Sequence, residues 1–199
     1  MAQVADVEVT ALDPEQKSFW GDTTTVGLVS AVIMAVLMVA SLQIAERVDT
    51  MLTGGVFIPF GIMIEKIFDI LAVVTYGFVA GLIVANLNPI ISVATASGPM
   101  APLWFFTNTG TVLAARVVHF YIVKKDIRDQ SYLDTFWICL GGMIVDATIM
   151  FPVQLLYFKM PLTTIAWMKV AELATGTIIP AFIINRAGKA LKRMQTRGG

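Results

Sequence analysis

Two long apolar segments follow each other near the end of the chain, FWICLGGMIVDATIMFPVQLLYF at 136–158 and LTTIAWMKVAELATGTIIPAFII at 162–184. Only Lys159, Met160 and Pro161 separate them. A helix of about 20 apolar residues crosses a hydrocarbon core of about 30 Å, and so short a connection joins antiparallel neighbours. The sequence therefore predicts a transmembrane helical hairpin.

The composition of the whole chain agrees with a membrane protein. Of its 199 residues, 57% are hydrophobic and 14% are charged, and the mean hydropathy is +0.77. The chain has no Gly-rich phosphate loop, nucleophile motif or nucleic-acid motif. A single cysteine, Cys139, and a single histidine, His119, leave no ligand set for a metal ion or haem. We expect no catalytic residues, no cofactor and no nucleic-acid partner.

The other apolar segments predict an all-α, polytopic protein with six transmembrane helices. The first four spans are expected at about 23–45, 51–68, 70–87 and 104–123. The second is expected to be short or broken, because Gly54, Gly55 and Pro59 interrupt it and charged residues follow at 65–69. Residues 88–103 predict an irregular connector, since they contain three prolines. An acidic tail, 1–22, and a basic tail, 191–199, flank the 23–190 domain.

The distribution of Lys and Arg predicts the orientation of the chain in the cell membrane. Two of them, Arg47 and Lys159, fall in segments on one side. Ten fall on the other side, namely Lys17, Lys66, Lys124, Lys125, Arg128, Arg186, Lys189, Lys192, Arg193 and Arg197. This asymmetry places both termini in the cytoplasm. If the second span is re-entrant instead, five crossings place the N-terminus outside.

The hairpin carries ionisable groups deep inside its apolar segments. Asp146 is expected near the membrane middle, and Lys169 and Glu172 share one helix face because they are three residues apart. A charge at that depth usually faces a bundle interior, a partner or a cavity. One interpretation is an internal ion pair or triad that locks the helices. The other is a pocket open to the outer face, in which these groups bind a polar or cationic solute.

Aromatic and amide side chains are expected at the same outer level of the membrane. They come from the last three spans and comprise Trp104, Asn108, Gln154, Tyr157 and Trp167. Such a set offers ring faces and directional hydrogen bonds to a small flat solute. An interfacial aromatic belt is the alternative for Trp104 and Tyr157.

Small residues repeat every four positions along the first span, at Gly27, Ala31 and Ala35. They share one helix face with little side-chain bulk, so another helix can approach closely. That helix belongs either to a partner or to the same chain, and the spacing fits both alternatives equally. Gly77 and Gly81 predict a second such face, with internal packing favoured.

The chain resembles the substrate-binding S component of energy-coupling factor (ECF) transporters. The ladder of Gly27, Ala31 and Ala35 looks like the alanine motif through which S components meet their transmembrane T component. The likeness extends to Gly141-Gly142-Met143-Ile144-Val145-Asp146 and to Asn185-Arg186-Ala187-Gly188-Lys189-Ala190-Leu191. The resemblance implies a vitamin-like solute bound from outside, and energy supplied by separate ATPase subunits.

Together these features predict a solute-capturing subunit of an ECF-type importer that binds a small vitamin-like or precursor compound. A cationic or amine-bearing ring is slightly favoured, because two carboxylates outnumber one ammonium at depth. Two rival hypotheses remain. The first is a stand-alone, ion-coupled secondary transporter that uses Asp146 and Glu172 as relay groups. The second is an accessory subunit of a membrane complex that transports nothing, whose charges only hold helices together.

Overall fold

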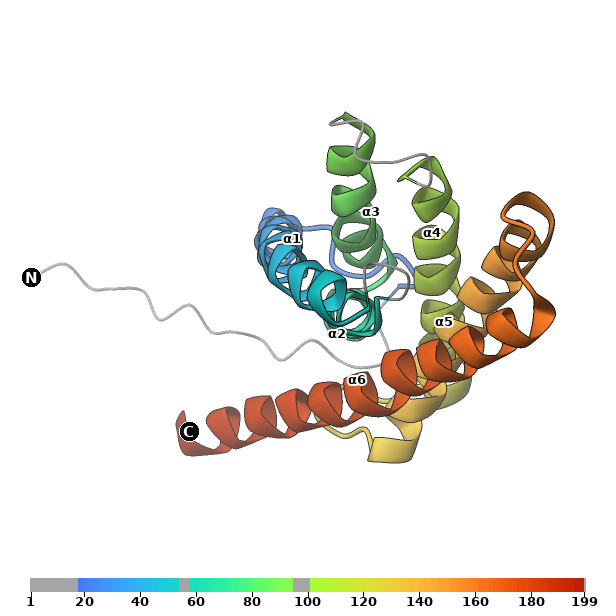
Figure 1. Cartoon of the computed structure of the whole chain (residues 1–199). Coiled ribbons are helices and arrows are strands. Elements are labelled where there is room, and N and C mark those ends of the chain that lie inside the picture. Colours follow the sequence, from blue (N-terminus) through green and yellow to red (C-terminus); the bar gives the residue numbers. More distant parts are fainter. Residues whose placement is uncertain (1–17, 54–57, 95–100, 199) are drawn as a thin grey trace, which may run out of the picture.

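The protein folds into a bundle of helices (Figure 1). The computed structural model describes residues 18–53, 58–94 and 101–198, and within these ranges it contains six α-helices and no strand. The α-helices are α1 (Thr25–Thr53), α2 (Pro59–Tyr76), α3 (Phe78–Ala94), α4 (Ala101–Val117), α5 (Tyr132–Pro152) and α6 (Leu162–Gly198). Two π-helical segments, η2 (Val118–Val123) and η3 (Val153–Tyr157), continue α4 and α5. The all-α prediction is confirmed.

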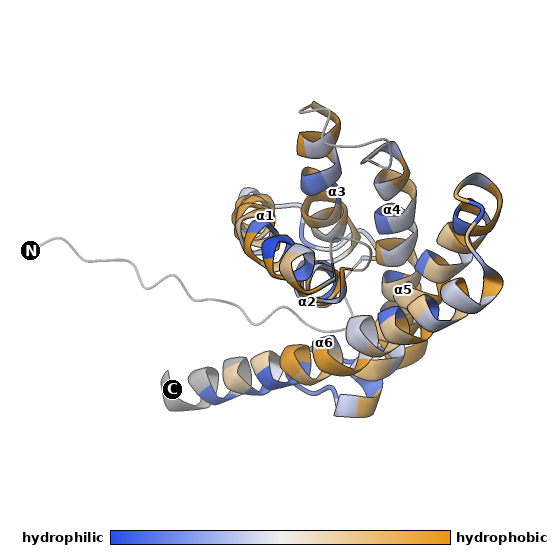
Figure 2. Cartoon of the chain, viewed as in Figure 1, coloured by the Kyte–Doolittle hydropathy of each residue, from blue (hydrophilic) through white to orange (hydrophobic). Residues whose placement is uncertain are grey.

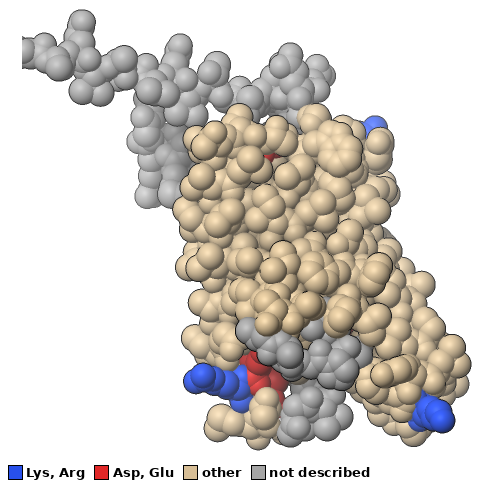
Figure 3. Space-filling model, turned by 90° about the horizontal axis from the view of Figure 1, so that it is seen from above, with Lys and Arg blue, Asp and Glu red and all other residues tan. Residues whose placement is uncertain are grey.

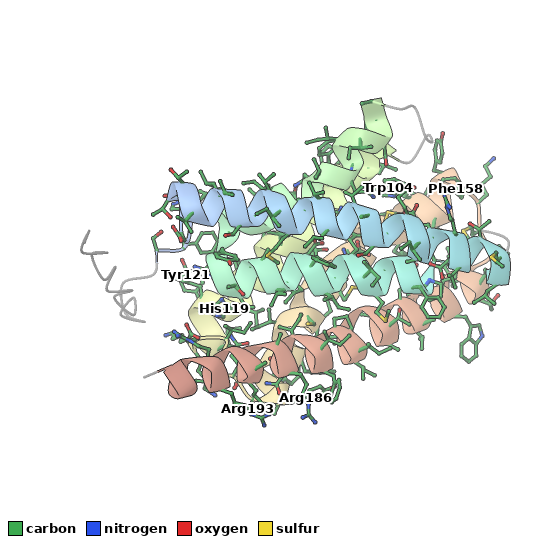
Figure 4. The ribbon with its side chains drawn as sticks, turned by 90° about the vertical axis from the view of Figure 1, so that its left-hand side faces the viewer. Trp104, His119, Tyr121, Phe158, Arg186 and Arg193 are labelled. Carbon is green, nitrogen blue, oxygen red and sulfur yellow. The ribbon has the colours of Figure 1, made fainter. Side chains whose placement is uncertain are left out.

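Consecutive helices run in opposite directions, which gives the bundle two distinct ends. We call one the terminal end, where residues 18–22, the 124–131 loop and the C-terminal part of α6 meet. His119 and Arg193 mark it in Figure 4. The other is the hairpin end, which holds the α5–α6 turn at 158–161 and is marked by Trp104 and Phe158. Asn185 of α6 donates to the Gln130 carbonyl over 2.8 Å and ties the terminal end together.

Three of the helices are long and apolar enough to cross a membrane. They cover Thr25–Leu52, Tyr132–Tyr157 and Leu162–Ala190. Hydrophobic residues run along the helices in Figure 2, and the face in Figure 3 carries its charged side chains near its edges. On α1 the exposed side chains include Val26, Val32 and Val36, which suit contact with lipid tails. The protein is therefore a membrane protein, and the full six-span layout stays a prediction.

The expected limits of the first two spans are wrong. Helix α1 does not end near 45 but continues to Thr53, because Glu46 and Arg47 are accommodated within the helix. Helix α2 begins at Pro59, whose fixed φ suits the first helical position, and it continues to Tyr76. The charges at 65–69 therefore lie in the middle of α2 and do not end it. Gly54 and Gly55, expected to break this span, lie outside the described residues.

The connector expected at 88–103 is also wrong over much of its length. Helix α3 includes Pro89 and ends at Ala94, and α4 begins at Ala101. Proline has no N–H to donate to the carbonyl four residues earlier, which is that of Ala85. Asn108 of α4 fills this gap, since its Nδ2 donates to the Ala85 carbonyl over 2.8 Å. A side chain from a neighbouring helix thus compensates for the proline, as membrane helices often require.

The small-residue ladder of α1 is packed inside the chain. Gly27, Ala31 and Ala35 are all buried, and Ala35 belongs to a core cluster with Ala72 of α2 and Val84 of α3. Of the two alternatives for this ladder, the structure shows internal packing. A partner cannot dock on Ala35 without displacing α2 or α3.

The two glycines at 77 and 81 do not share a helix face. Gly81 lies in α3 and packs closely against Val73 and Val112, as expected for internal packing. Gly77 is the single residue between α2 and α3, and its φ is 101°. Only glycine adopts this backbone conformation without strain, and here it reverses the chain.

Asp49 fixes the α1–α2 connection at the hairpin end. Its carboxylate accepts hydrogen bonds from the backbone N–H groups of Phe60, at 3.1 Å, and Gly61, at 2.8 Å. These N–H groups belong to the first turn of α2, which has no side-chain cap of its own. A buried carboxylate of α1 thus caps the next helix and complements the positive end of its dipole.

A short segment before α1, which we call the strap, closes the terminal end of the bundle. The strap comprises residues 18–22. The Asp22 N–H donates to the Tyr76 carbonyl over 2.7 Å, and the Val79 N–H donates to the Trp20 carbonyl over 3.1 Å. These bonds hold the strap against the reversal between α2 and α3. The Phe19 ring packs on Phe78.

Arg116 of α4 anchors the strap from the other side. Its guanidinium donates to the carbonyls of Ser18 and Phe19, both over 2.8 Å, and lies 3.0 Å from Nδ1 of His119. Because a guanidinium only donates, Nδ1 must accept, so Nε2 carries the proton and donates to the Lys125 carbonyl. Arg116 is fully buried.

Candidate functional site

Six ionisable side chains from three helices lie together within the apolar bundle. We call them the charged cluster. They are Glu65, Lys66 and Asp69 of α2, Asp146 of α5, and Lys169 and Glu172 of α6. Four carboxylates and two ammonium groups meet in this region, so the acids outnumber the bases.

The spacing of the residues explains how the helices bring these groups together. On α2, Lys66 and Asp69 are three residues apart and thus share a face, and their exposed fractions are 3% and 0%. On α6, the buried positions Ile165, Lys169 and Glu172 are four and three residues apart and thus also share a face. Helix α6 packs against both α2 and α5, so its buried face joins theirs.

Within each helix the charges are partly paired. The Lys66 Nζ lies 3.0 Å from Oε1 of Glu65 and donates a hydrogen bond to it. The Asp69 carboxylate is farther away, with Oδ2 at 3.8 Å from the same Nζ. On α6, the Lys169 ammonium donates to the Glu172 carboxylate. The predicted pairing of Lys169 with Glu172 is present.

Asp146 connects the groups of the two other helices. Its carboxylate interacts electrostatically with Lys66 and Asp69 of α2 and with Glu172 of α6. Among the described residues it makes no hydrogen bond or ion pair. The triad expected within the hairpin is therefore part of a larger group that includes α2.

Asp69 is the most isolated of these carboxylates. Its side chain is fully buried, and neither oxygen has a hydrogen-bond partner among the residues that the structure describes. Burying an ionised carboxylate without donors is costly, and such groups are usually hydrogen-bonded. Asp69 therefore has the Lys66 ammonium nearby, at 3.8 Å, but no hydrogen-bond donor among the described residues.

The remaining predicted site residues are separated by the structure. Tyr157 and Trp167 are 71% and 76% exposed, so they lie on the outer surface, as an aromatic belt requires. Trp104 is half-buried at the hairpin end (Figure 4). Gln154 is buried, and its Oε1 has no hydrogen-bond partner among the described residues. Asn108 is buried and bound to the Ala85 carbonyl, so its role is structural.

This role of Asn108 gives a testable prediction. Replacing it by Leu removes the donor and leaves the Ala85 carbonyl buried without a partner, because Pro89 cannot supply one. We expect a loss of about 1–3 kcal/mol in the free energy of unfolding. Unfolding of the full chain in detergent measures it. Phe106→Leu, at an exposed position of α4, serves as the control, and equal stability of the two variants would contradict this account.

The sequence interpretation missed the three charged residues of α2. Glu65, Lys66 and Asp69 were expected to end the second span, and Lys66 was counted with the cytoplasmic cations. Without Lys66, nine Lys and Arg residues remain on the side predicted to be cytoplasmic and two on the outer side, so the charge asymmetry that predicts the orientation is kept. A signal for the correct interpretation exists, since residues 60–76 contain no proline and only one glycine, and Lys66 and Asp69 have helical spacing.

Metal chemistry has no support within the described part of the chain, where no group of three or more His, Cys, Asp or Glu is arranged to hold a metal ion. The cluster is instead an electrostatic site with an excess of carboxylates, fit to bind a positive or hydrogen-bond-donating group. Comparison of the chain with protein families, with curated proteins and with solved structures gave no match.

Proposed function

We propose that this protein is a membrane-embedded subunit that captures a small solute from the outer face of the cell membrane. The observation that supports this proposal is the charged cluster. Each charge at the centre of a membrane helix costs about 2.5–3.5 kcal/mol on insertion scales, so six of them suggest a use beyond packing. These charges come from three different helices. A solute that enters among them would therefore change the contacts between the helices.

The solute site we propose combines the predicted Asp146, Lys169 and Glu172 with the charged groups of α2. Tyr157 and Trp167 are left out because they are exposed. Asn108 is left out because its side chain donates to a backbone carbonyl of α3. The solute is a small polar compound of the vitamin or vitamin-precursor kind. Binding and a change of exposure, with no covalent step, constitute the mechanism.

The partners we propose are those of an ECF importer, a transmembrane T component and ATPase subunits. The resemblance of the chain to S components favours them, and so does the apolar surface of α1. Because Gly27, Ala31 and Ala35 are buried, the T component would contact exposed residues of the same helix, such as Val29 and Val36. The proposed contact with the T component therefore does not involve the small-residue ladder.

A second candidate function is a stand-alone carrier coupled to an ion gradient. The excess of carboxylates over ammonium groups favours it, because buried carboxylates form the relay in many ion-driven transporters. In that case Asp69, which the sequence interpretation did not include, would join Asp146 and Glu172 as a relay group.

Capture of the tagged full chain from its native membranes tests the proposal. We expect a T component and ATPase subunits to copurify with it, and not with an unrelated tagged membrane protein. The purified chain in liposomes provides the second measurement. Proton flux through the chain alone, lost in Asp146→Asn and seen without copurified ATPases, would select the carrier. Absence of both partners and flux would select the accessory subunit.

A further inference from the structure

Two carboxylates of the charged cluster remain after its closest ion pairs are assigned. Lys66 donates to Glu65 over 3.0 Å, and Lys169 donates to Glu172. Asp69, with 3.8 Å between its Oδ2 and Lys66 Nζ, lies beyond hydrogen-bond distance. Asp146 also makes no hydrogen bond among the described residues. Asp69 and Asp146 are therefore the two carboxylates of the cluster that accept no hydrogen bond from any described residue.

The two carboxylates come from different helices but belong to one electrostatic group. Asp69 and Asp146 interact with each other, and Lys66 interacts with both. Asp69 is fully buried and has four lone-pair positions without a donor. A fully buried carboxylate that accepts no hydrogen bond from any described residue is the observation that points to a missing donor group.

The chemistry of that group follows from what the two carboxylates lack. A primary ammonium carries one positive charge and three N–H donors, and bonds from it to carboxylates are stronger than neutral ones. A divalent metal ion requires several convergent oxygen ligands, which no group of described residues provides. A quaternary ammonium brings the charge but no donor.

We infer that Asp69 of α2 and Asp146 of α5 bind the primary ammonium group of the solute. The substrate class is then a small organic amine, and Asp69 is its main specificity-determining residue. This inference rests on the proposed function, because it assigns a ligand to the same site. The remaining charges have a supporting role, since the Lys66–Glu65 and Lys169–Glu172 pairs keep the rest of the cluster neutral.

Two members of the cluster are partly exposed at the surface of the protein. The Asp146 residue is only partly buried, and the Glu65 side chain is 18% exposed. Glu46 of α1 interacts electrostatically with Glu65 and adds a further carboxylate near it. These acids attract cations toward the deeper Asp69 before any contact forms.

The experiment compares two probes that differ only in their N–H donors. Ethanolamine carries a primary ammonium, and choline is the same molecule with three methyl groups on the nitrogen. Thermal unfolding of the purified full chain in detergent is followed against the concentration of each probe and of sodium chloride. We expect saturable stabilisation by ethanolamine, with choline at least about tenfold weaker in apparent affinity and sodium chloride without a saturable effect.

Variants locate the binding. Asp69→Asn and Asp146→Asn are each expected to weaken ethanolamine at least about tenfold, since each loses one charge-assisted partner. Asp129→Asn, in the exposed loop at the terminal end, is the matched control and keeps the wild-type response. If Asp69→Asn does not fold, Asp146→Asn decides the matter, because Asp146 is only partly buried.

Three results would overturn the inference. The first is equal stabilisation by ethanolamine and choline, the second is an effect reproduced by sodium chloride, and the third is an unchanged response in Asp146→Asn. The absence of any saturable response to ethanolamine counts in the same way. The proposed function is tested separately through its copurifying partners. A chain that brings down ATPases yet ignores ethanolamine keeps that function and loses the amine substrate.

Discussion

Gly77→Ala is expected to destabilise the protein strongly. The φ of 101° is strained for any residue with a side chain. The added Cβ would also collide with the Gly21 Cα and lie 2.9 Å from the Gly21 nitrogen and 3.0 Å from the Trp20 carbonyl oxygen. All three are backbone atoms of the strap and cannot rotate away. We expect a loss of about 2–4 kcal/mol in the free energy of unfolding.

Chemical unfolding in detergent measures this loss, with Gly61→Ala as the matched control. Gly61 lies inside α2, and the nearest atoms to its added Cβ are at 3.4 Å or more, which is ordinary contact. Alanine is also the better helix former, so this variant should keep or slightly raise the stability. A Gly77→Ala protein as stable as Gly61→Ala would mean that the strap does not pack on the reversal.

Lys66→Met is expected to have the second large effect. The substitution keeps a long side chain but removes the only ammonium that the described residues place close to Glu65 and Asp69. It leaves the fully buried Asp69 and the partly exposed Glu65 on one helix face without that ammonium. Removing one partner of a buried ion pair typically costs about 3–5 kcal/mol, because the remaining charge stays desolvated. We expect a loss of that size in the free energy of unfolding in detergent.

An exposed ion pair provides the comparison. Lys125 forms a 2.8 Å pair with Asp134, but its side chain is 50% exposed. Lys125→Met should cost only about 0–1 kcal/mol, since water compensates for the lost contact. Adding Asp69→Leu to Lys66→Met should recover part of the loss, because it removes the isolated carboxylate. Equal effects of the two lysine substitutions would show that Lys66 is solvated.

The hairpin of α5 and α6 is the part of the fold that the sequence predicts best. Two uninterrupted apolar segments and a three-residue turn leave little freedom, and the observed limits differ from the expected ones mainly at the ends. The pairing of Lys169 with Glu172 is equally local, because three residues along a helix bring two side chains to one face. Such features depend on positions close in the chain.

The α2 half of the charged cluster depends on tertiary structure and was harder to predict. A short segment with Glu65, Lys66 and Asp69 resembles the polar end of a membrane helix. Only the packing of α2 against α6 shows that these charged side chains lie near the charged side chains of α6. Pro89 was misinterpreted for a similar reason, because the donor that lets α3 continue through it comes from Asn108, 19 positions later.

The single residue between α2 and α3 also limits how these helices can move. One residue spans at most about 3.6 Å of chain, so neither helix can slide along the other by a full turn without disrupting the reversal at Gly77. Any displacement of Asp69 toward a solute must therefore tilt α2 about Gly77, and α3 and the strap must follow or release. Cross-linking the strap to α4 should then prevent this tilt of α2 while leaving the charged cluster itself unaltered.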